Sequence, residues 1–151
     1  MKYQQETIEW VRKEIEPLLV QHYHEVALNK DKIKYDPNWE FYYKAEQLNM
    51  FYVFTARTDA GKLVGYNCYF LNPHPHYGGT MCAVNDIFYV VPEYRGKMAG
   101  VRLLKFSEDT LHKTRGVTYF FMHVKPDHDF SAILLNRGYS LHEYIYSKVL
   151  D

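Results

Sequence analysis

The stretch VNDIFYVVPEYRGKMAGVRLLKF, residues 84–106, joins an apolar run to a segment of helical spacing through a turn with small residues and two cations. The apolar run begins at Met81, and its near-continuous apolarity predicts a strand buried on both faces of a sheet. After the turn, Gly100 and three leucines recur on one side of a helix that ends at a C′ glycine, Gly116. The sequence therefore predicts a strand that passes directly into a helix here.

The turn between this strand and this helix has the features of an anion site. The first N–H groups of a helix have no intrahelical partner and lie at the positive end of the helix dipole. Gly96, Ala99 and Gly100 leave the backbone open to close approach, and Arg95 and Lys97 add charge that can pair with phosphate. A pyrophosphate fits this description, and the alternative is a solvated turn with two incidental cations. Neither a Walker loop nor a GxGxxG fingerprint occurs in the chain.

The composition excludes several other classes of function. The 151 residues predict a single domain, 1–151, and 18 basic and 18 acidic side chains leave no overall field to recruit nucleic acid or an anionic membrane. Without an apolar span of membrane length or an apolar signal segment, we expect a soluble protein of the cytoplasm. Cys68 and Cys82 form no CxxC motif, and no HExxH spacing accompanies the histidines. We therefore expect no metal and no disulfide framework.

The rest of the chain alternates helical and strand patterns. Apolar residues at helical spacing from Thr7 onward predict a first helix, which Pro17 kinks or divides, and Asn38 caps a second helix over residues 39–48. No strand is evident before the first helix. Further strands are predicted at 50–57, 63–71, 81–91, 117–124 and 141–150, with a short helix at 130–137. This order predicts an α+β (α/β) fold with helices packed against a sheet.

Residues 84–106 resemble the signature segment of the GNAT acyltransferase superfamily, in which an apolar strand of the form V-x-P-x-x-R leads into R/Q-x-x-G-x-G/A. The resemblance includes AGKLVGY before this segment and VTYFFMHV and LLNRGYS after it, and covers most of the chain from Met50 onward. It implies a mixed, mostly antiparallel central sheet with a splayed strand pair, flanked by helices on both faces, and acetyl-CoA as co-substrate. The segments HYHEVAL, NWEFYYKAEQL and HPHY are also similar to bacteriophage-encoded GNAT proteins, which would work in the host cytoplasm.

The resemblance assigns residues to the parts of acetyl-CoA. Phe88, Tyr89 and Val90 would border the splayed strand whose backbone bonds the pantetheine arm. The pyrophosphate would be wrapped by Arg95, Gly96, Lys97, Met98, Ala99 and Gly100. Two positions depart from the family pattern: Met98 replaces the first glycine of R-x-x-G-x-G, and Leu134 replaces a tyrosine that often protonates the leaving thiolate. The tyrosines that could take over this role are Tyr139, Tyr144 and Tyr146.

Transfer of an acyl group to an amine requires a base that removes a proton from the amine. Asp86 lies inside the apolar strand and, by alternation, shares a face with Phe88 and Val90, where apolar surroundings would raise its pKa. The alternative is a structural carboxylate that caps a backbone N–H or pairs with an arginine. His123, near the end of the next strand, is a second candidate as a base or relay, and a simple hydrogen bond is its alternative.

The sequence thus predicts an N-acetyltransferase that moves an acetyl group from acetyl-CoA to a primary amine of a small molecule or protein by direct attack. The alternative is a catalytically weak or inactive GNAT-fold module that binds a protein partner, such as a host target of a phage, and Met98 and Leu134 favour it. No nucleic-acid or membrane partner is expected, and a homodimer remains open. The acceptor is not indicated, because a polyamine, an antibiotic, an amino acid and a protein all present amines.

Overall fold

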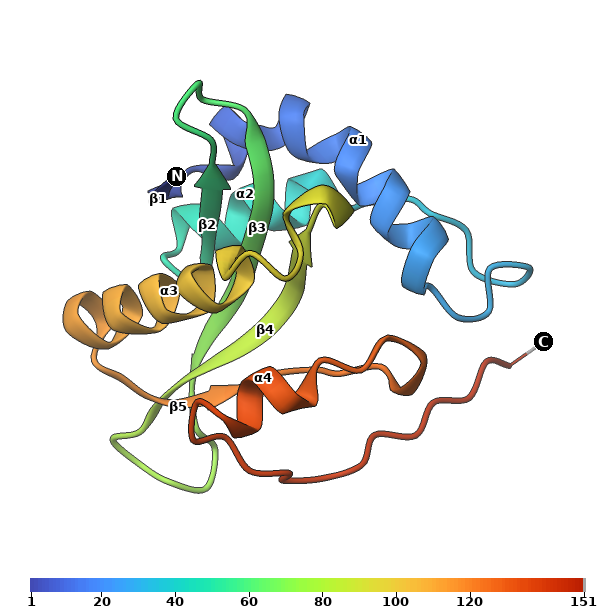
Figure 1. Ribbon diagram of the computed structural model, residues 1–151. Helices are drawn as coiled ribbons and strands as arrows, with labels where there is room; N and C mark the ends of the chain where they lie inside the picture. The colour runs from blue at the N-terminus through green and yellow to red at the C-terminus, as the bar shows by residue number, and fades with distance from the viewer. Residues whose placement is uncertain (151) are drawn as a thin grey trace.

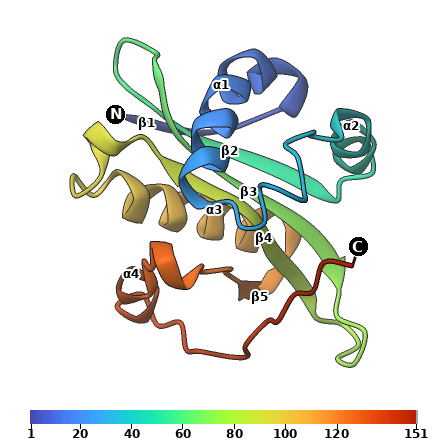
Figure 2. The same ribbon diagram turned by 90° about the vertical axis from the view of Figure 1, so that its right-hand side faces the viewer.

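The computed structural model describes residues 1–150 as a five-stranded sheet between two layers of helices (Figure 1). The strands, in their order across the sheet, are β1 (Lys2–Glu6), β2 (Phe51–Arg57), β3 (Leu63–Pro73), β4 (Met81–Val90) and β5 (Val117–Phe121). Neighbours from β1 to β4 are antiparallel, whereas β4 and β5 are parallel. The α-helices are α1 (Ile8–Val26), α2 (Trp39–Gln47), α3 (Ala99–Arg115) and α4 (Ser131–Leu135). Figure 2 shows α1 and α2 on one face and α3 and α4 on the other, which confirms the predicted mixed sheet with helices on both faces.

Helix α1 has the apolar spacing that the sequence predicts. It begins after Thr7, whose hydroxyl accepts a hydrogen bond from the backbone N–H of Trp10 at 3.3 Å. The side chains that it buries against the sheet are Ile8, Val11, Ile15 and Leu19. The helix continues through Pro17, so the proline does not divide it. None of the helices within residues 1–150 is both long and apolar enough to cross a membrane.

The segment before α1 forms a strand that the sequence did not indicate. KYQQE pairs antiparallel with β2, from Lys2 opposite Arg57 to Glu6 opposite Val53. Because β1 is at the edge of the sheet, its residues are exposed or half-buried, although the Glu6 side chain is largely covered, and no apolar alternation marks the strand. The prediction of no strand before the first helix is therefore wrong.

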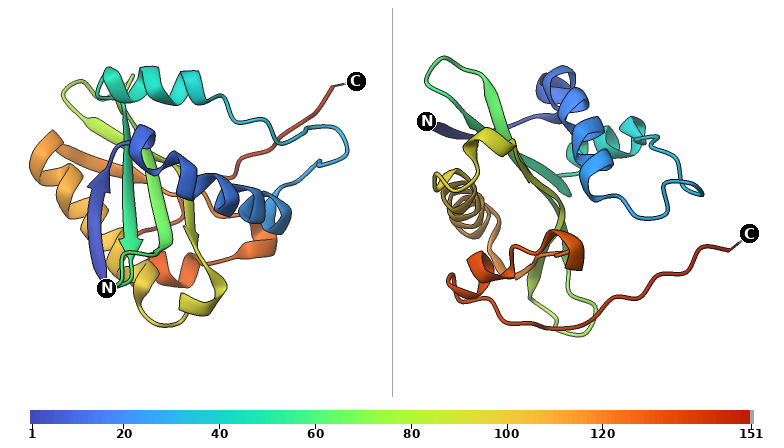
Figure 3. Two further views of the ribbon diagram at one scale, coloured as in Figure 1. Left: turned by 90° about the horizontal axis from the view of Figure 1, so that it is seen from above. Right: turned by 45° about the vertical axis from the view of Figure 1, so that its right-hand side comes forward.

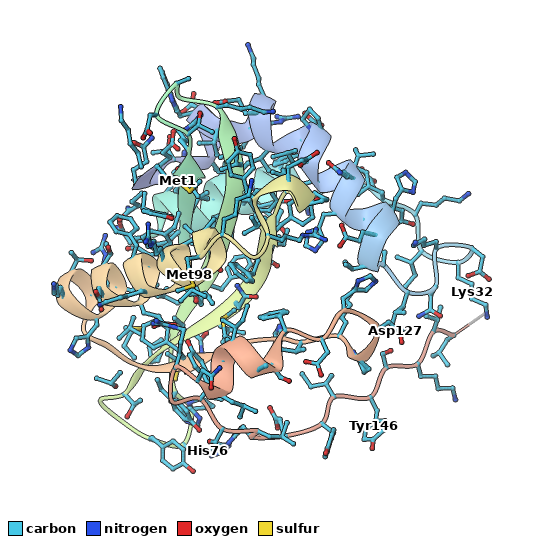
Figure 4. All side chains as sticks on the ribbon, in the orientation of Figure 1. Met1, Lys32, His76, Met98, Asp127 and Tyr146 are labelled. Carbon is cyan, nitrogen blue, oxygen red and sulfur yellow. The ribbon has the colours of Figure 1, made fainter. Side chains whose placement is uncertain are left out.

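The predicted final strand at 141–150 is also wrong. This segment is unpaired and extends past the body of the protein, with Tyr146 on its outer side (Figure 4). Its apolar side chains are exposed except for the half-buried Val149, with Tyr144 at 76% and Tyr146 at 91% of their accessible surface. Alternation of apolar and polar residues indicates that a segment can form a strand, but a strand also needs a neighbour with free backbone groups.

Candidate active site

Strands β4 and β5 separate after a short parallel pairing and leave a cleft between them. The pairing covers only Met81 to Val84 of β4, so residues 85–90 have no strand neighbour on that side. The cleft has a volume of about 820 Å³. The end of α1, the second half of β4, the turn before α3 and residues 123–133 line the cleft, and Figure 3 shows these segments from two further directions. The splayed strand pair of the predicted fold is thus present.

A β-bulge interrupts the regular alternation of β4 inside this cleft. Cys68 of β3 lies opposite Ile87, and the next residue, Tyr69, lies opposite Asn85. Asp86 is therefore an extra residue without a partner on β3. A bulge of this kind redirects a side chain, and here it redirects the carboxyl group of Asp86.

The carboxyl group of Asp86 lies on the α2 side of the sheet, where Tyr42 Oη donates a hydrogen bond to Asp86 Oδ2 at 3.0 Å. Phe88 and Val90 lie on the α3 side, because a Cβ added to Gly100 of α3 would be 3.1 Å from Phe88 Cζ and 3.5 Å from Val90 Cγ2. The prediction that the three β4 residues share a face is wrong, since simple alternation does not include the bulge. All three nevertheless line the cleft.

The surroundings of Asp86 favour a basic carboxylate. Burial raises the pKa of Asp86, and the hydrogen bond from Tyr42 and the nearby His123 only partly oppose this effect. Burial, followed by the neighbouring Asp86 charge, also raises the pKa of Tyr42, which keeps its hydroxyl protonated as the donor. His123 is exposed, follows β5 and lines the same cleft. Both predicted proton-transfer residues are therefore brought to one site.

A buried polar network supports the bulge from the α3 side. Asn85 Nδ2 donates to Asn67 Oδ1 at 2.8 Å and to the carbonyl oxygen of Cys68 at 3.1 Å. Asn67 Nδ2 in turn donates to Ser107 Oγ of α3 at 2.8 Å. Asn67, Asn85 and Ser107 are all buried, so their polar groups depend on one another for hydrogen bonds. The network ties β3, β4 and α3 together beside Asp86.

The turn before α3 presents a row of unpaired backbone donors. Gly96 and Met98 both have left-handed backbone conformations, with φ of 74° and 61°. The backbone N–H groups of residues 96–101 make no hydrogen bond to any part of the chain that the structure describes. The first intrahelical bond runs from the N–H of Arg102 to the carbonyl oxygen of Met98 at 3.0 Å. Such a row of donors at a helix N-terminus binds anions.

The two cations of the turn differ in their surroundings. Arg95 Nη1 forms an ion pair with Glu25 of α1 at 2.7 Å, and Arg95 Nε donates to the carbonyl oxygen of Val90 at 2.8 Å. The guanidinium of Arg95 thus links the turn to α1 and β4. The Lys97 ammonium lies 5.4 Å from the Tyr94 ring centre, and Lys97 does not line the cleft. The candidate anion site therefore consists mainly of backbone groups.

The sequence missed several residues that shape the cleft. His22 of α1 stacks on Tyr89 with ring centres 4.8 Å apart, and burial lowers the pKa of His22 to about 4, so its ring is neutral at pH 7. Tyr42 and Glu25 position Asp86 and Arg95, respectively. The aromatic content of residues 39–48 was the one signal for Tyr42, and nothing in the sequence distinguished His22 or Glu25.

The tyrosines considered as acids in place of Leu134 do not reach the cleft. Tyr139 Oη donates to Glu108 Oε1 of α3 at 2.8 Å and does not line the cleft, and Tyr144 and Tyr146 lie in the exposed C-terminal segment. Leu134 itself is buried. Within residues 1–150, no three His, Cys, Asp or Glu side chains form a group that could hold a metal ion.

The sequence model of the acetyltransferase (GNAT) family matches residues 12–139, which is most of the chain. The chain belongs to the GNAT family. No curated protein sequence matches it significantly. Solved GNAT structures share its fold at low identity: ribosomal-protein-alanine N-acetyltransferase from Brucella melitensis biovar Abortus 2308 is 17% identical over 100% of both chains, with a TM-score of 0.72.

Two further solved structures illustrate the breadth of this GNAT fold. An aminoglycoside acetyltransferase from an uncultured soil metagenomic sample, in complex with sisomicin, is 18% identical over 99% of this chain and 96% of that chain, with a TM-score of 0.74. Glucosamine-6-phosphate N-acetyltransferase from Arabidopsis thaliana is 16% identical over 100% of both chains, with a TM-score of 0.70. At these identities the similarity establishes the fold, and the acceptor must be sought in this chain's own residues.

Met98 carries backbone strain at the position where the GNAT pattern has glycine. A left-handed conformation costs a residue with a side chain about 1–2 kcal/mol, and glycine adds about 0.5–1 kcal/mol of unfolded-chain entropy. Met98→Gly should therefore raise the free energy of unfolding by about 0.5–1 kcal/mol, measured by urea titration. Met98→Ala is the matched control, because it shortens the half-exposed side chain but keeps the strain. A destabilised Met98→Gly protein would contradict this account.

Proposed function

We propose that the protein is an acetyl-CoA-dependent N-acetyltransferase that acts on a primary amine by direct attack. The observation that carries the proposal is the row of unpaired N–H groups at residues 96–101, which follows the free edge of β4 after the turn at residues 91–95. Family membership supports the reaction class. The raised pKa of Asp86 in the same cleft supports proton removal from an amine.

The residues of the cleft fit the parts of acetyl-CoA. The backbone N–H groups of 96–101 suit a diphosphate, and Gly96, where an added Cβ would meet nothing within 4 Å, leaves room for its oxygens. The unpaired edge of β4 over residues 85–90 offers backbone donors and acceptors to an extended, amide-containing arm. Acetyl-CoA would supply a thioester, whose acetyl carbon accepts the amine nitrogen and whose sulfur leaves as a thiol.

Asp86 would act on the acceptor. An ammonium acceptor must lose one proton before its nitrogen can attack, and the Asp86 carboxylate takes that proton. The N–C bond forms as the C–S bond breaks, and the second proton lost by the nitrogen ends on the thiol. His123, exposed at the cleft, would pass the first proton from Asp86 to solvent.

The test is the melting temperature with and without acetyl-CoA. A ligand at about 100 times its Kd stabilises the native state by roughly 2.7 kcal/mol, which for a chain of this size is a rise of about 5–10 °C. Arg95→Ala should reduce this rise by more than half, because Arg95 holds the turn to α1 and β4. Arg102→Ala removes an exposed arginine of α3 outside the cleft and is the control. No rise in the unmodified protein would refute the proposal.

The second candidate is a GNAT-fold module that binds a protein partner without catalysis. The observation in its favour is Leu134, which replaces the tyrosine acid of many relatives and lies buried in α4. Thiol release from acetyl-CoA with a panel of amines separates the two candidates, since the module would melt at a higher temperature with acetyl-CoA and yet release no thiol. A homodimer and a bacteriophage origin stay predictions of the sequence.

A further inference from the structure

A second cavity, of about 260 Å³, lies under α1 and α2 next to the cleft. The residues that line both spaces are Leu19, Tyr23, Tyr35, Asp86 and Ile87. The cavity therefore adjoins the cleft at the carboxyl group that we assign as the base. A molecule with its amine at Asp86 can extend its remaining atoms into this cavity.

The wall of the cavity is apolar and aromatic, but it contains two hydroxyl groups without partners. Side chains from α1, α2, β2 and β3 form most of the wall, including Trp39, Tyr42 and Phe51. Tyr66 has no exposed surface, and its Oη makes no hydrogen bond within residues 1–150. Tyr35 Oη is likewise buried and unpartnered. Buried hydroxyl groups normally have a partner, so these two favour a ligand with a hydrogen-bonding group.

The charges around the cavity suit a single ammonium group. Among residues 1–150, Asp86 is the one residue of the cavity wall with a carboxyl group apart from Asp36, which is exposed and accompanied by the exposed Lys34. An acceptor with several ammonium groups would need a carboxylate for each, because an unpaired charge is costly to bury. This arrangement disfavours polyamines and aminoglycosides.

The volume limits the size of the group that enters. A cavity of about 150 Å³ holds benzene. The space of about 260 Å³ is therefore enough for one six-membered ring with a short chain. Aromatic walls favour a flat ring, which can contact them edge-to-face or in an offset stack.

We propose that the acceptor is a primary monoamine with a hydroxylated aromatic ring, whose nitrogen lies at Asp86 and whose ring fills the cavity against Tyr66. This assignment rests on the function proposed above. The reaction is the same one: the nitrogen gains the acetyl group, the thiol is released, and one proton of the ammonium form goes to Asp86. The ring and its hydroxyl contribute binding and orientation.

The experiment measures thiol release and product mass with five amines at one concentration of acetyl-CoA. They are 4-hydroxyphenylethylamine, phenylethylamine, spermidine, kanamycin and a peptide containing one lysine. We expect kcat/KM for the hydroxylated ring amine to exceed that for spermidine, kanamycin and the peptide at least tenfold. As a readout without turnover, the same ring amine should raise the melting temperature of the protein saturated with coenzyme A.

Two matched variants test the cavity itself. Tyr66→Phe removes the fully buried one of the two unpartnered hydroxyl groups and should lower the kcat/KM ratio of hydroxylated to plain ring amine by about tenfold. Tyr52→Phe removes another buried and unpartnered hydroxyl, on β2 and outside both spaces, and should leave the ratio unchanged. Cys68→Met places a larger side chain in the cavity wall and should lower kcat/KM for both ring amines, with Cys82→Met as the control outside both spaces.

The outcomes distinguish this inference from the proposed function. If acetyl-CoA raises the melting temperature but spermidine, kanamycin or the peptide is the best acceptor, the inference is wrong and the cofactor assignment stands. The same holds if acetyl-CoA binds and the ring amines neither bind nor react, or if Tyr66→Phe and Tyr52→Phe affect the ratio equally. If acetyl-CoA produces no rise at all, the proposed function fails, and the inference that rests on it fails as well.

Discussion

Asp86→Asn should lower kcat by about 10²–10³-fold, because a positioned general base contributes about this much to a proton transfer. The amide has the shape of the carboxyl group and can still accept the hydrogen bond that Tyr42 donates at 3.0 Å. The substitution therefore removes the proton acceptor and leaves the geometry of the bulge intact. The rise in melting temperature with acetyl-CoA should be retained.

The direction in which Asp86→Asn changes the stability of the protein can also be predicted. Because burial raises the pKa of Asp86 in the folded protein, the folded state binds the proton more tightly than the unfolded state. Stability from this group is fully present below the unfolded pKa of about 3.9 and is lost as pH rises through the folded pKa. At pH 7 the charged Asp86 opposes folding, so Asp86→Asn should melt at the same or a higher temperature. Loss of activity without loss of stability would identify a chemical role.

The pH profile provides a second test of Asp86. Activity should rise with pH as Asp86 loses its proton, and Tyr42→Phe should shift this rise to higher pH, because the Tyr42 hydrogen bond lowers the pKa of Asp86. Asp127→Asn is the control, because Asp127, which is labelled in Figure 4, is exposed, and this variant should have an unchanged profile. If Asp86→Asn retains more than about a tenth of the activity, Asp86 is not the base.

The parts of the fold that the sequence predicted are those with local signals. Residues 84–106 indicated the strand, the turn and the helix, because apolar periodicity and turn residues act over short distances. Strand β1 was missed because its stability depends on β2, fifty residues further along, and its own side chains are polar. The prediction of a strand at 141–150 failed for the opposite reason. This segment has the alternating pattern of a strand, but no other strand pairs with it.

In the candidate site, too, the features with local sequence signals were predicted and those that depend on distant residues were not. The unpaired donors of residues 96–101 follow from the local strand-to-helix turn, and they were predicted. The face of the sheet on which the Asp86 side chain lies was not predicted correctly, because it depends on a β-bulge that only the pairing with β3 reveals. The ion pair of Arg95 with Glu25 joins elements seventy residues apart, and the network of Asn67 with Ser107 joins a strand to a helix. Such contacts leave no pattern in a single sequence.

Arg57→Leu should destabilise the protein by about 3–5 kcal/mol, because it leaves a buried carboxylate without its partner. The Arg57 guanidinium bonds Glu6 of β1 at 2.9 Å, Glu14 of α1 at 2.8 Å and the carbonyl oxygen of Gly61 at 2.9 Å. The Glu6 side chain is only 8% exposed, whereas that of Glu14 is 45% exposed and can turn to water. This cost is a large part of the roughly 5–15 kcal/mol of a typical domain, and urea unfolding at pH 7 measures it.

A second substitution and a change of pH separate an unpaired charge from lost packing. Burial would raise the pKa of Glu6, but hydrogen bonds from Arg57 and Thr55 outweigh it and hold the pKa below its ordinary value. This stability is present above the unfolded pKa of about 4.3 and is lost as pH falls through the folded pKa. The difference between the unmodified protein and Arg57→Leu should therefore shrink below about pH 5, where Glu6 of the variant becomes protonated. Adding Glu6→Leu should restore most of the stability at pH 7, since two apolar side chains can replace a buried ion pair. If the double variant is as unstable as Arg57→Leu at every pH, packing of the arginine rather than its charge joins β1 to the sheet.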